Sequence, residues 1–214
     1  MIKSRFGFAL DAPIQRILPF LFRWRLNPNA LTVLGLAISL LGAACFAQGE
    51  FRWGAAAVAL GGLCDLVDGV VARHLGRQTR FGAFLDSSLD RVVDAALLSA
   101  LAVFYAGEGR AAVAWLACAA LLFAVLAPYA KARSDALASA PEGGAARAAA
   151  AAGAAAEGAA QRGERVLMER AERILVLLAG ALLNLMPLAL AAVAVGGAVT
   201  SAQRIAAARL RLAE

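Results

Sequence analysis

The sequence predicts an all-α integral membrane protein with six transmembrane helices, preceded by an amphipathic helix that lies in the membrane interface. Of its 214 residues, 62% are hydrophobic, a fraction too high for a soluble protein. Several apolar runs approach the roughly 20 residues that span a bilayer. Four aspartates interrupt these runs, and charges at membrane depth usually face a bundle interior or a water-filled cavity.

Residues 1–26 form the predicted interfacial helix. Apolar and basic side chains alternate there with a helix-like spacing, a pattern typical of a helix lying in the plane of the membrane. Asn27-Pro28-Asn29 ends this segment, and Pro28 suits the first turn of the next helix with Asn27 as its cap. We expect residues 27–214 to form one six-helix membrane domain.

The six transmembrane helices are expected at residues 30–48, 54–74, 82–106, 111–131, 172–187 and 188–205. The last two are short, and residues 184–187 mark the turn between them. Residues 136–163 are rich in alanine and glycine with interspersed charges, so we expect a cytoplasmic loop there, with a frayed helix as the alternative.

Basic residues predict the orientation. They gather in the N-terminal segment, in the connection after the second span, in the connection after the fourth span and in the tail. The opposite connections carry only Arg52 and Arg110, beside Glu50 and Glu108. By the positive-inside rule, both termini and the aspartates lie on the cytoplasmic side of the cytoplasmic membrane. Anionic lipid head groups explain the net charge of +6 better than nucleic acid does.

The four aspartates stand within residues 65–90. Asp65 and Asp68 are three apart and Asp86 and Asp90 four apart, so on helices each pair shares a face. Carboxylates without a lysine among them suit Mg²⁺, Mn²⁺ or Ca²⁺. The alternative is a set of half-buried carboxylates neutralised by nearby arginines. Asp94 continues the Asp86 and Asp90 face, either as a supporting residue or as the partner of an arginine.

The whole stretch fits D-x2-D-G-x2-A-R-x8-G-x3-D-x3-D without a gap. This string resembles the signature of the CDP-alcohol phosphotransferase family of integral membrane enzymes, also called phosphatidyltransferases. The resemblance implies a homodimer that transfers a phosphatidyl group from CDP-diacylglycerol to an alcohol and releases CMP. It also implies two Mg²⁺ or Mn²⁺ ions held by Asp65, Asp68, Asp86 and Asp90, with Asp90 acting as the general base.

The same resemblance implies contacts with both substrates. The CDP-lipid would be bound by Asn27, Pro28, Asn29, Ala30, Gly69, Arg73 and Thr79. Basic residues at the cytoplasmic ends of the last three spans suggest an anionic acceptor, such as a sugar or polyol phosphate. These residues are Lys131, Arg133, Arg170, Arg173 and Arg204. For any one of them, the alternative is ordinary positive-inside flanking.

Shorter pieces bear on the acceptor. K-A-R, E-R-x-E-R and Q-R, with LDSSLDRVVDAA, resemble the phosphatidylinositol phosphate synthase branch, whose acceptor is inositol 1-phosphate. TRFGAFLD fits phosphatidylglycerophosphate synthases equally, whose acceptor is glycerol 3-phosphate, and the connection from YAKAR to ERAER is longer than the first branch leads us to expect. A cation transporter built on the aspartates is a remoter alternative, because the motif has no second copy of the kind that repeated transporter halves show.

Overall fold

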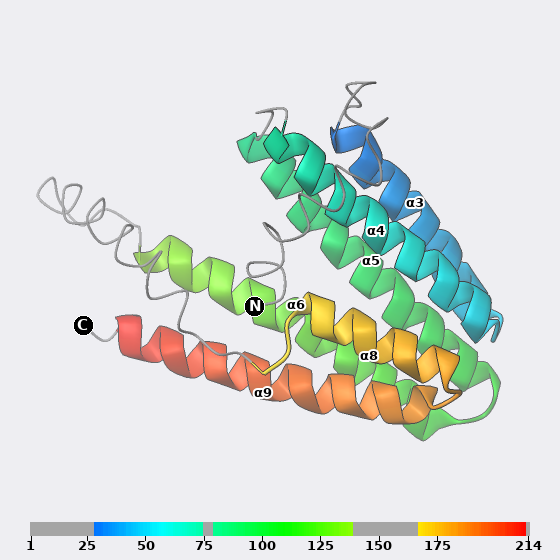
Figure 1. Ribbon diagram of the computed structural model, residues 1–214. Helices are drawn as coiled ribbons and strands as arrows, with labels where there is room; N and C mark the ends of the chain where they lie inside the picture. Colours follow the sequence, from blue (N-terminus) through cyan, green and yellow to red (C-terminus); the bar gives the residue numbers. More distant parts are fainter. Residues whose placement is uncertain (1–27, 75–78, 139–166, 213–214) are drawn as a thin grey trace, which may run out of the picture.

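The computed structural model of the protein describes residues 28–74, 79–138 and 167–212. These residues form α-helices and no strand, which confirms the all-α class. The helices in chain order are α3 (Pro28–Ala47), α4 (Phe51–His74), α5 (Arg80–Gly107), α6 (Ala111–Ala138), α8 (Arg170–Leu182) and α9 (Met186–Leu212) (Figure 1).

The helices α3, α4, α6 and α9 are long and apolar enough to cross a membrane, by length and composition. Among the described residues, four of the six predicted spans thus have the length and composition of a transmembrane helix, which agrees with an integral membrane protein. The other two helices do not meet these requirements of length and apolar composition. α5 has 28 residues but carries Asp86, Asp90 and Asp94 in its first half, and α8 has only 13 residues.

The first three predicted spans begin and end within three residues of α3, α4 and α5. α6 continues to Ala138 because the polar residues after position 131 extend the helix instead of ending it. The turn before α9 occupies residues 183–185, so α8 is shorter than predicted and Pro187 stands in the first turn of α9, where proline is tolerated. The predicted interfacial helix at 1–26 and residues 139–163 of the predicted loop lie outside the described residues, and residues 136–138 belong to α6.

α3 and α4 form a closely packed antiparallel pair. A Cβ added to Gly35 of α3 would lie 3.0 Å from the carbonyl oxygen of Gly61 of α4, and one added to Gly42 would lie 3.0 Å from that of Gly54. Small residues let helix backbones approach in this way in membranes. α5 packs on α3 and α6, α6 packs on α9, and α8 contacts both α9 and α4 (Figure 1).

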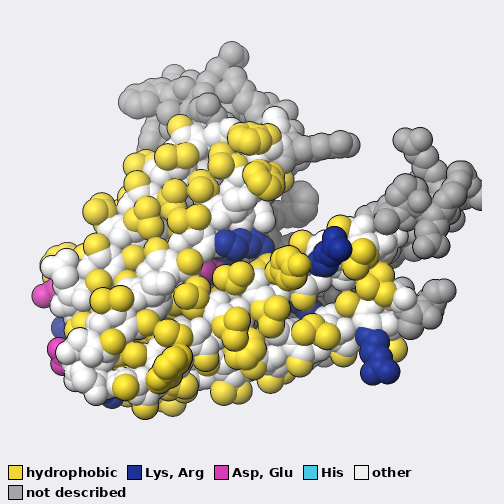
Figure 2. Space-filling view, turned by 180° about the vertical axis from the view of Figure 1, so that it is seen from behind, with side chains coloured by type: hydrophobic (Ala, Val, Ile, Leu, Met, Phe, Trp, Pro, Cys, Tyr) yellow, Lys and Arg dark blue, Asp and Glu magenta, His cyan; other side chains and the backbone are white. Residues whose placement is uncertain are grey.

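Apolar side chains fill the interior and also cover the outside. Leu97 and Leu101 of α5 and Leu190 of α9 are buried in the core, whereas Trp53 and Leu122 are exposed. Figure 2 shows hydrophobic side chains over most of one face, with charged side chains gathered in a few places. An exterior of this kind suits contact with lipid.

Tight turns make successive helices antiparallel. Gly49 at φ 78° joins α3 to α4, Gly109 at φ 71° joins α5 to α6, and Asn184 at φ 56° joins α8 to α9. Glycine adopts positive φ without strain, and asparagine tolerates it better than most residues. Only residues 75–79 separate the end of α4 from the beginning of α5, so these two helix ends lie at the same end of the bundle (Figure 1). The motif aspartates stand in the second half of α4 and the first half of α5.

Candidate active site

Three of the four motif aspartates lie together. Asp65 of α4 and Asp86 and Asp90 of α5 each offer a carboxylate oxygen, and these oxygens all lie within 4.8 Å of one another. All three residues are partly buried. The helical spacing that paired Asp86 with Asp90 places both on the face of α5 that turns toward Asp65.

Asp68 is the most buried of the four, with 6% of its surface exposed. It lies one turn after Asp65 and accepts a hydrogen bond from Thr32 Oγ1 of α3 at 2.5 Å. The hydroxyl fixes the orientation of this carboxylate. Thr32 was not among the residues predicted from the sequence, although its spacing of three from Asn29 places both on one face of α3.

The cluster also contains a cation from α8. Arg170 Nη1 lies 2.5 Å from Asp90 Oδ1 and 3.3 Å from Asp65 Oδ2, and Arg170 Nε lies 3.9 Å from Asp94 Oδ1. Asp65, Asp86, Asp90 and Asp94 all interact electrostatically with the Arg170 guanidinium. Arg170 is a permanent positive charge against the carboxylates.

Asp94 pairs with Arg173 in addition. Arg173 Nη2 lies 2.5 Å from Asp94 Oδ2, and the side chains are 7% and 6% exposed. Of the two alternatives for Asp94, the structure therefore favours an arginine partner from another helix over Arg91, which donates instead to Ser87. The first turn of α8 is itself braced, because Glu169 N donates to Glu172 Oε2 at 2.9 Å.

The residues present fit a divalent cation of the Mg²⁺ type. The donor set consists of carboxylate oxygens, without histidine or cysteine in the group. An octahedral Mg²⁺ ion about 2.1 Å from its ligands places neighbouring oxygens about 3 Å and opposite oxygens about 4.2 Å apart. Asp65, Asp86 and Asp90 could hold such an ion, with Asp68 beside them.

Where the structure describes them, the residues predicted to bind the CDP-lipid belong to α3, to α4 or to the N-cap of α5. Asn29 and Ala30 stand in the first turn of α3, and Gly69 directly follows Asp68. Thr79 is the N-cap of α5, where its Oγ1 accepts from Gly82 N at 2.9 Å. Asn27 and the side chains of Pro28 and Arg73 lie outside the part that the structure describes. Lipid contact by this set stays a prediction.

The five basic residues predicted for the acceptor phosphate fall into two groups. Arg170 and Arg173 face the aspartates from α8, as described above. Arg204 of α9 donates from Nη1 to the carbonyl oxygen of Ala127 at 2.7 Å, one turn before Lys131 on α6. Lys131 and Arg133 are exposed. Phosphate binding by the five stays a prediction.

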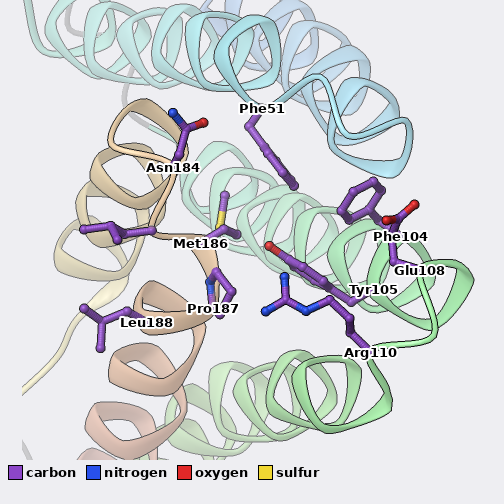
Figure 3. A pocket seen from close by; sticks show the side chains of 10 residues that line it. Phe51, Phe104, Tyr105, Glu108, Arg110, Asn184, Met186, Pro187 and Leu188 are labelled. Atoms are coloured by element: carbon purple, nitrogen blue, oxygen red, sulfur yellow. The ribbon is translucent and has the colours of Figure 1, made fainter.

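A cavity of about 460 Å³ lies at the other end of the bundle (Figure 3). Phe51, Phe104, Tyr105 and Met186 line it, and the guanidinium carbon of Arg110 lies 5.1 Å from the centre of the Tyr105 ring. Tyr105 follows Asp90 by 15 residues of one helix, about 22 Å along its axis. The cavity is therefore separate from the carboxylate cluster.

Comparison with known proteins decides the family. The profile of the CDP-alcohol phosphatidyltransferases matches residues 25–202. The chain belongs to the CDP-alcohol phosphatidyltransferase family. The resemblance drawn from the motif and the prediction of an enzyme of this class are thus confirmed.

Several relatives are phosphatidylinositol phosphate synthases. That of Streptomyces avermitilis is 37% identical over 214 residues, covering 91% of this chain and 77% of the relative. That of Mycobacteroides abscessus is 34% identical over 200 residues, covering 88% of this chain and 80% of the relative.

Solved structures of a phosphatidylinositol phosphate synthase from Mycobacterium tuberculosis have a similar fold. The structure with CDP-DAG bound has a TM-score of 0.70 and 25% identity, covering 96% of this chain and 94% of that chain. The complex with manganese and citrate has a TM-score of 0.72 and 28% identity, covering 92% and 88%. Membership of this family explains why the present chain has a cluster of carboxylates.

Proposed function

We propose that this phosphatidyltransferase is a phosphatidylinositol phosphate synthase, which transfers the phosphatidyl group of CDP-diacylglycerol to inositol 1-phosphate and releases CMP. The observation that carries the proposal is the meeting of three carboxylates from α4 and α5 with the arginines that begin α8. Such a site combines ligands for a cation on a diphosphate with cations for a second, anionic substrate.

The donor would lie over the ends of α3, α4 and α5. Two Mg²⁺ or Mn²⁺ ions held by Asp65, Asp68, Asp86 and Asp90 would neutralise the diphosphate and the leaving CMP. Thr32 holds Asp68 in position for this. Contacts to the CDP part would come from Asn27, Pro28, Asn29, Ala30, Gly69, Arg73 and Thr79.

Asp90 would act as the general base. Its carboxylate would take the proton from the acceptor hydroxyl while the hydroxyl oxygen attacks the phosphorus that carries diacylglycerol. The bond from that phosphorus to the CMP oxygen breaks, and CMP leaves with the electron pair. Asp90 Oδ1 lies 2.5 Å from Arg170 Nη1, so the proposed base stands beside a side chain proposed to bind the acceptor phosphate.

The acceptor phosphate would bind among Lys131, Arg133, Arg170, Arg173 and Arg204. Charge-assisted bonds from arginine suit a phosphate dianion. The position of Arg170 supports this assignment, because one side chain at the edge of the carboxylate cluster can reach a substrate bound beside it.

We extend the proposal to the membrane. α5 and α8 would span or enter the bilayer with the four more apolar helices, making six transmembrane helices after an interfacial helix at residues 1–26. Both termini and the site would be cytoplasmic, and the enzyme would be a homodimer. The distribution of basic residues and the family support this arrangement.

An acceptor panel tests the function. Purified protein with Mn²⁺ or Mg²⁺ and radiolabelled CDP-diacylglycerol would be offered inositol 1-phosphate, glycerol 3-phosphate, free inositol and serine. We expect a labelled lipid and CMP with inositol 1-phosphate. Turnover with glycerol 3-phosphate alone would make the protein a phosphatidylglycerophosphate synthase. No CMP release with any acceptor would overturn the reaction class, and the remoter alternative of a cation transporter would then be tested by flux in proteoliposomes.

A further inference from the structure

The guanidinium of Arg170 contacts two of the three carboxylates that could ligate a metal ion. Its Nη1 lies 2.5 Å from Asp90 Oδ1 and 3.3 Å from Asp65 Oδ2. Arg170 thus joins α8 to both helices that carry the cluster. Its side chain remains 26% exposed, so part of it borders open space.

Arg170 and a divalent cation cannot both hold these carboxylates in this way. An ion about 2.1 Å from the same two oxygens, Asp65 Oδ2 and Asp90 Oδ1, would lie close to the guanidinium nitrogen that now contacts them. The two positive charges would repel each other strongly in a half-buried site. One cation must leave for the other to bind.

We propose that Arg170 is an internal counter-ion that competes with the divalent metal for the Asp65, Asp86 and Asp90 cluster, and that its displacement makes its guanidinium available to the acceptor phosphate. Without metal, Arg170 offsets the repulsion among the carboxylates. With metal, the ion takes over that role and the arginine turns toward the second substrate. The second half of the proposal rests on the proposed function.

The neighbouring residues suit such an exchange. Arg173 is anchored by its buried pair with Asp94, and Glu169 and Glu172 brace the first turn of α8. The backbone of Arg170 can therefore stay in place while its long side chain moves. Arg173 does not have this freedom, since its side chain is 7% exposed.

The test measures Mn²⁺ affinity in detergent by electron paramagnetic resonance, without CDP-lipid or acceptor. Arg170→Gln should bind Mn²⁺ at least about tenfold more tightly than wild type, the factor expected if the guanidinium occupies the cluster about nine-tenths of the time. Arg91→Gln is the matched control. It removes the same charge beside Asp90, but Arg91 bonds to Ser87 and not to the cluster. Its Mn²⁺ affinity should stay within about twofold of wild type.

An equal gain in Arg91→Gln and Arg170→Gln would show a general charge effect and overturn the competition. Unchanged or weaker Mn²⁺ binding in Arg170→Gln would overturn it as well. Thermal unfolding gives a second readout: Arg170→Gln should melt below wild type in EDTA and at nearly the same temperature in saturating Mn²⁺. If Arg170→Gln does not fold, Arg170→Lys carries the same tests, with a smaller gain in affinity expected because lysine forms fewer of these contacts.

Linkage tests the second half. Sulfate serves as the probe because it resembles phosphate and binds Mn²⁺ weakly. In wild type it should tighten Mn²⁺ binding by about fivefold or more, since two ligands that favour the same displaced arginine assist each other. In Arg170→Gln the effect should vanish. An undiminished effect in the variant would assign the anion to other residues and leave the competition intact. The Mn²⁺ competition itself holds whichever alcohol the enzyme uses, so failure of the acceptor panel is a separate result.

Discussion

Arg173 of α8 and Asp94 of α5 form a buried ion pair, with Nη2 2.5 Å from Oδ2. It lies one turn beyond Asp90 on α5 and one turn beyond Arg170 on α8. The pair therefore fixes how α8 meets α5 directly beside the candidate site. Because both side chains are buried, each charge is neutralised mainly by the other and not by water.

Breaking this pair should destabilise the protein. Asp94→Asn leaves the buried Arg173 charge without its partner, which typically costs about 3–5 kcal/mol. Arg173→Gln should cost less, because Arg170 Nε still lies 3.9 Å from Asp94 Oδ1. The double variant Asp94→Asn/Arg173→Gln should lose less than the sum of the two single losses. Thermal or denaturant unfolding in detergent measures all three. Strict additivity would show that the pair does not couple the helices.

Asp90→Asn should abolish turnover while CDP-lipid affinity is largely retained. The variant removes the proposed base, an effect of about 10²–10⁴ in rate, but leaves the other three aspartates in place. Asp68→Asn is the comparison, because it should weaken metal-dependent nucleotide binding as well as turnover. Nucleotide titration and CMP release are measured on both. Full activity in Asp90→Asn would remove the base assignment.

Thr32→Val should weaken metal-dependent CDP binding by about tenfold, because residues that orient ligating groups often contribute that much. The hydroxyl donates to Asp68 at 2.5 Å, and valine has nearly the same shape without a donor. Thr32→Ser keeps the hydroxyl and should bind like wild type. Equal loss in both variants would point to packing of α3 instead of the hydrogen bond.

Lys131→Ala or Arg204→Ala should raise the acceptor KM by roughly tenfold or more, since about 1.4 kcal/mol is a factor of ten. The CDP-lipid KM should hardly change. Arg204 also bonds to Ala127 O, so unfolding of Arg204→Ala must be measured beside its kinetics. An unchanged acceptor KM in both variants would make these residues topology markers. Impairment with glycerol 3-phosphate but not inositol 1-phosphate would keep the pocket and change the acceptor.

Much of the fold follows from local pattern. Apolar runs predict the bounds of α3, α4 and α5 and the start of α6 within three residues, because helix length is encoded within each segment. α9 begins at Met186, two residues before its predicted start, and α6 and α9 each continue seven residues beyond their predicted ends. Hydropathy alone does not explain α5, whose first half carries three aspartates in a helix of 28 residues.

The sequence alone determined the family, the carboxylate motif and which aspartates share a face, because helical periodicity relates residues three and four apart. Only the tertiary structure decided which side chains meet across helices. Arg170 pairs with Asp65 across 105 residues, Arg173 with Asp94 across 79, and Thr32 with Asp68 across 36. Helical periodicity relates residues within one helix and cannot predict contacts between residues so far apart in the sequence. They depend on how α3, α4, α5 and α8 pack, and that packing places a cation from α8 among carboxylates that the sequence assigned to metal.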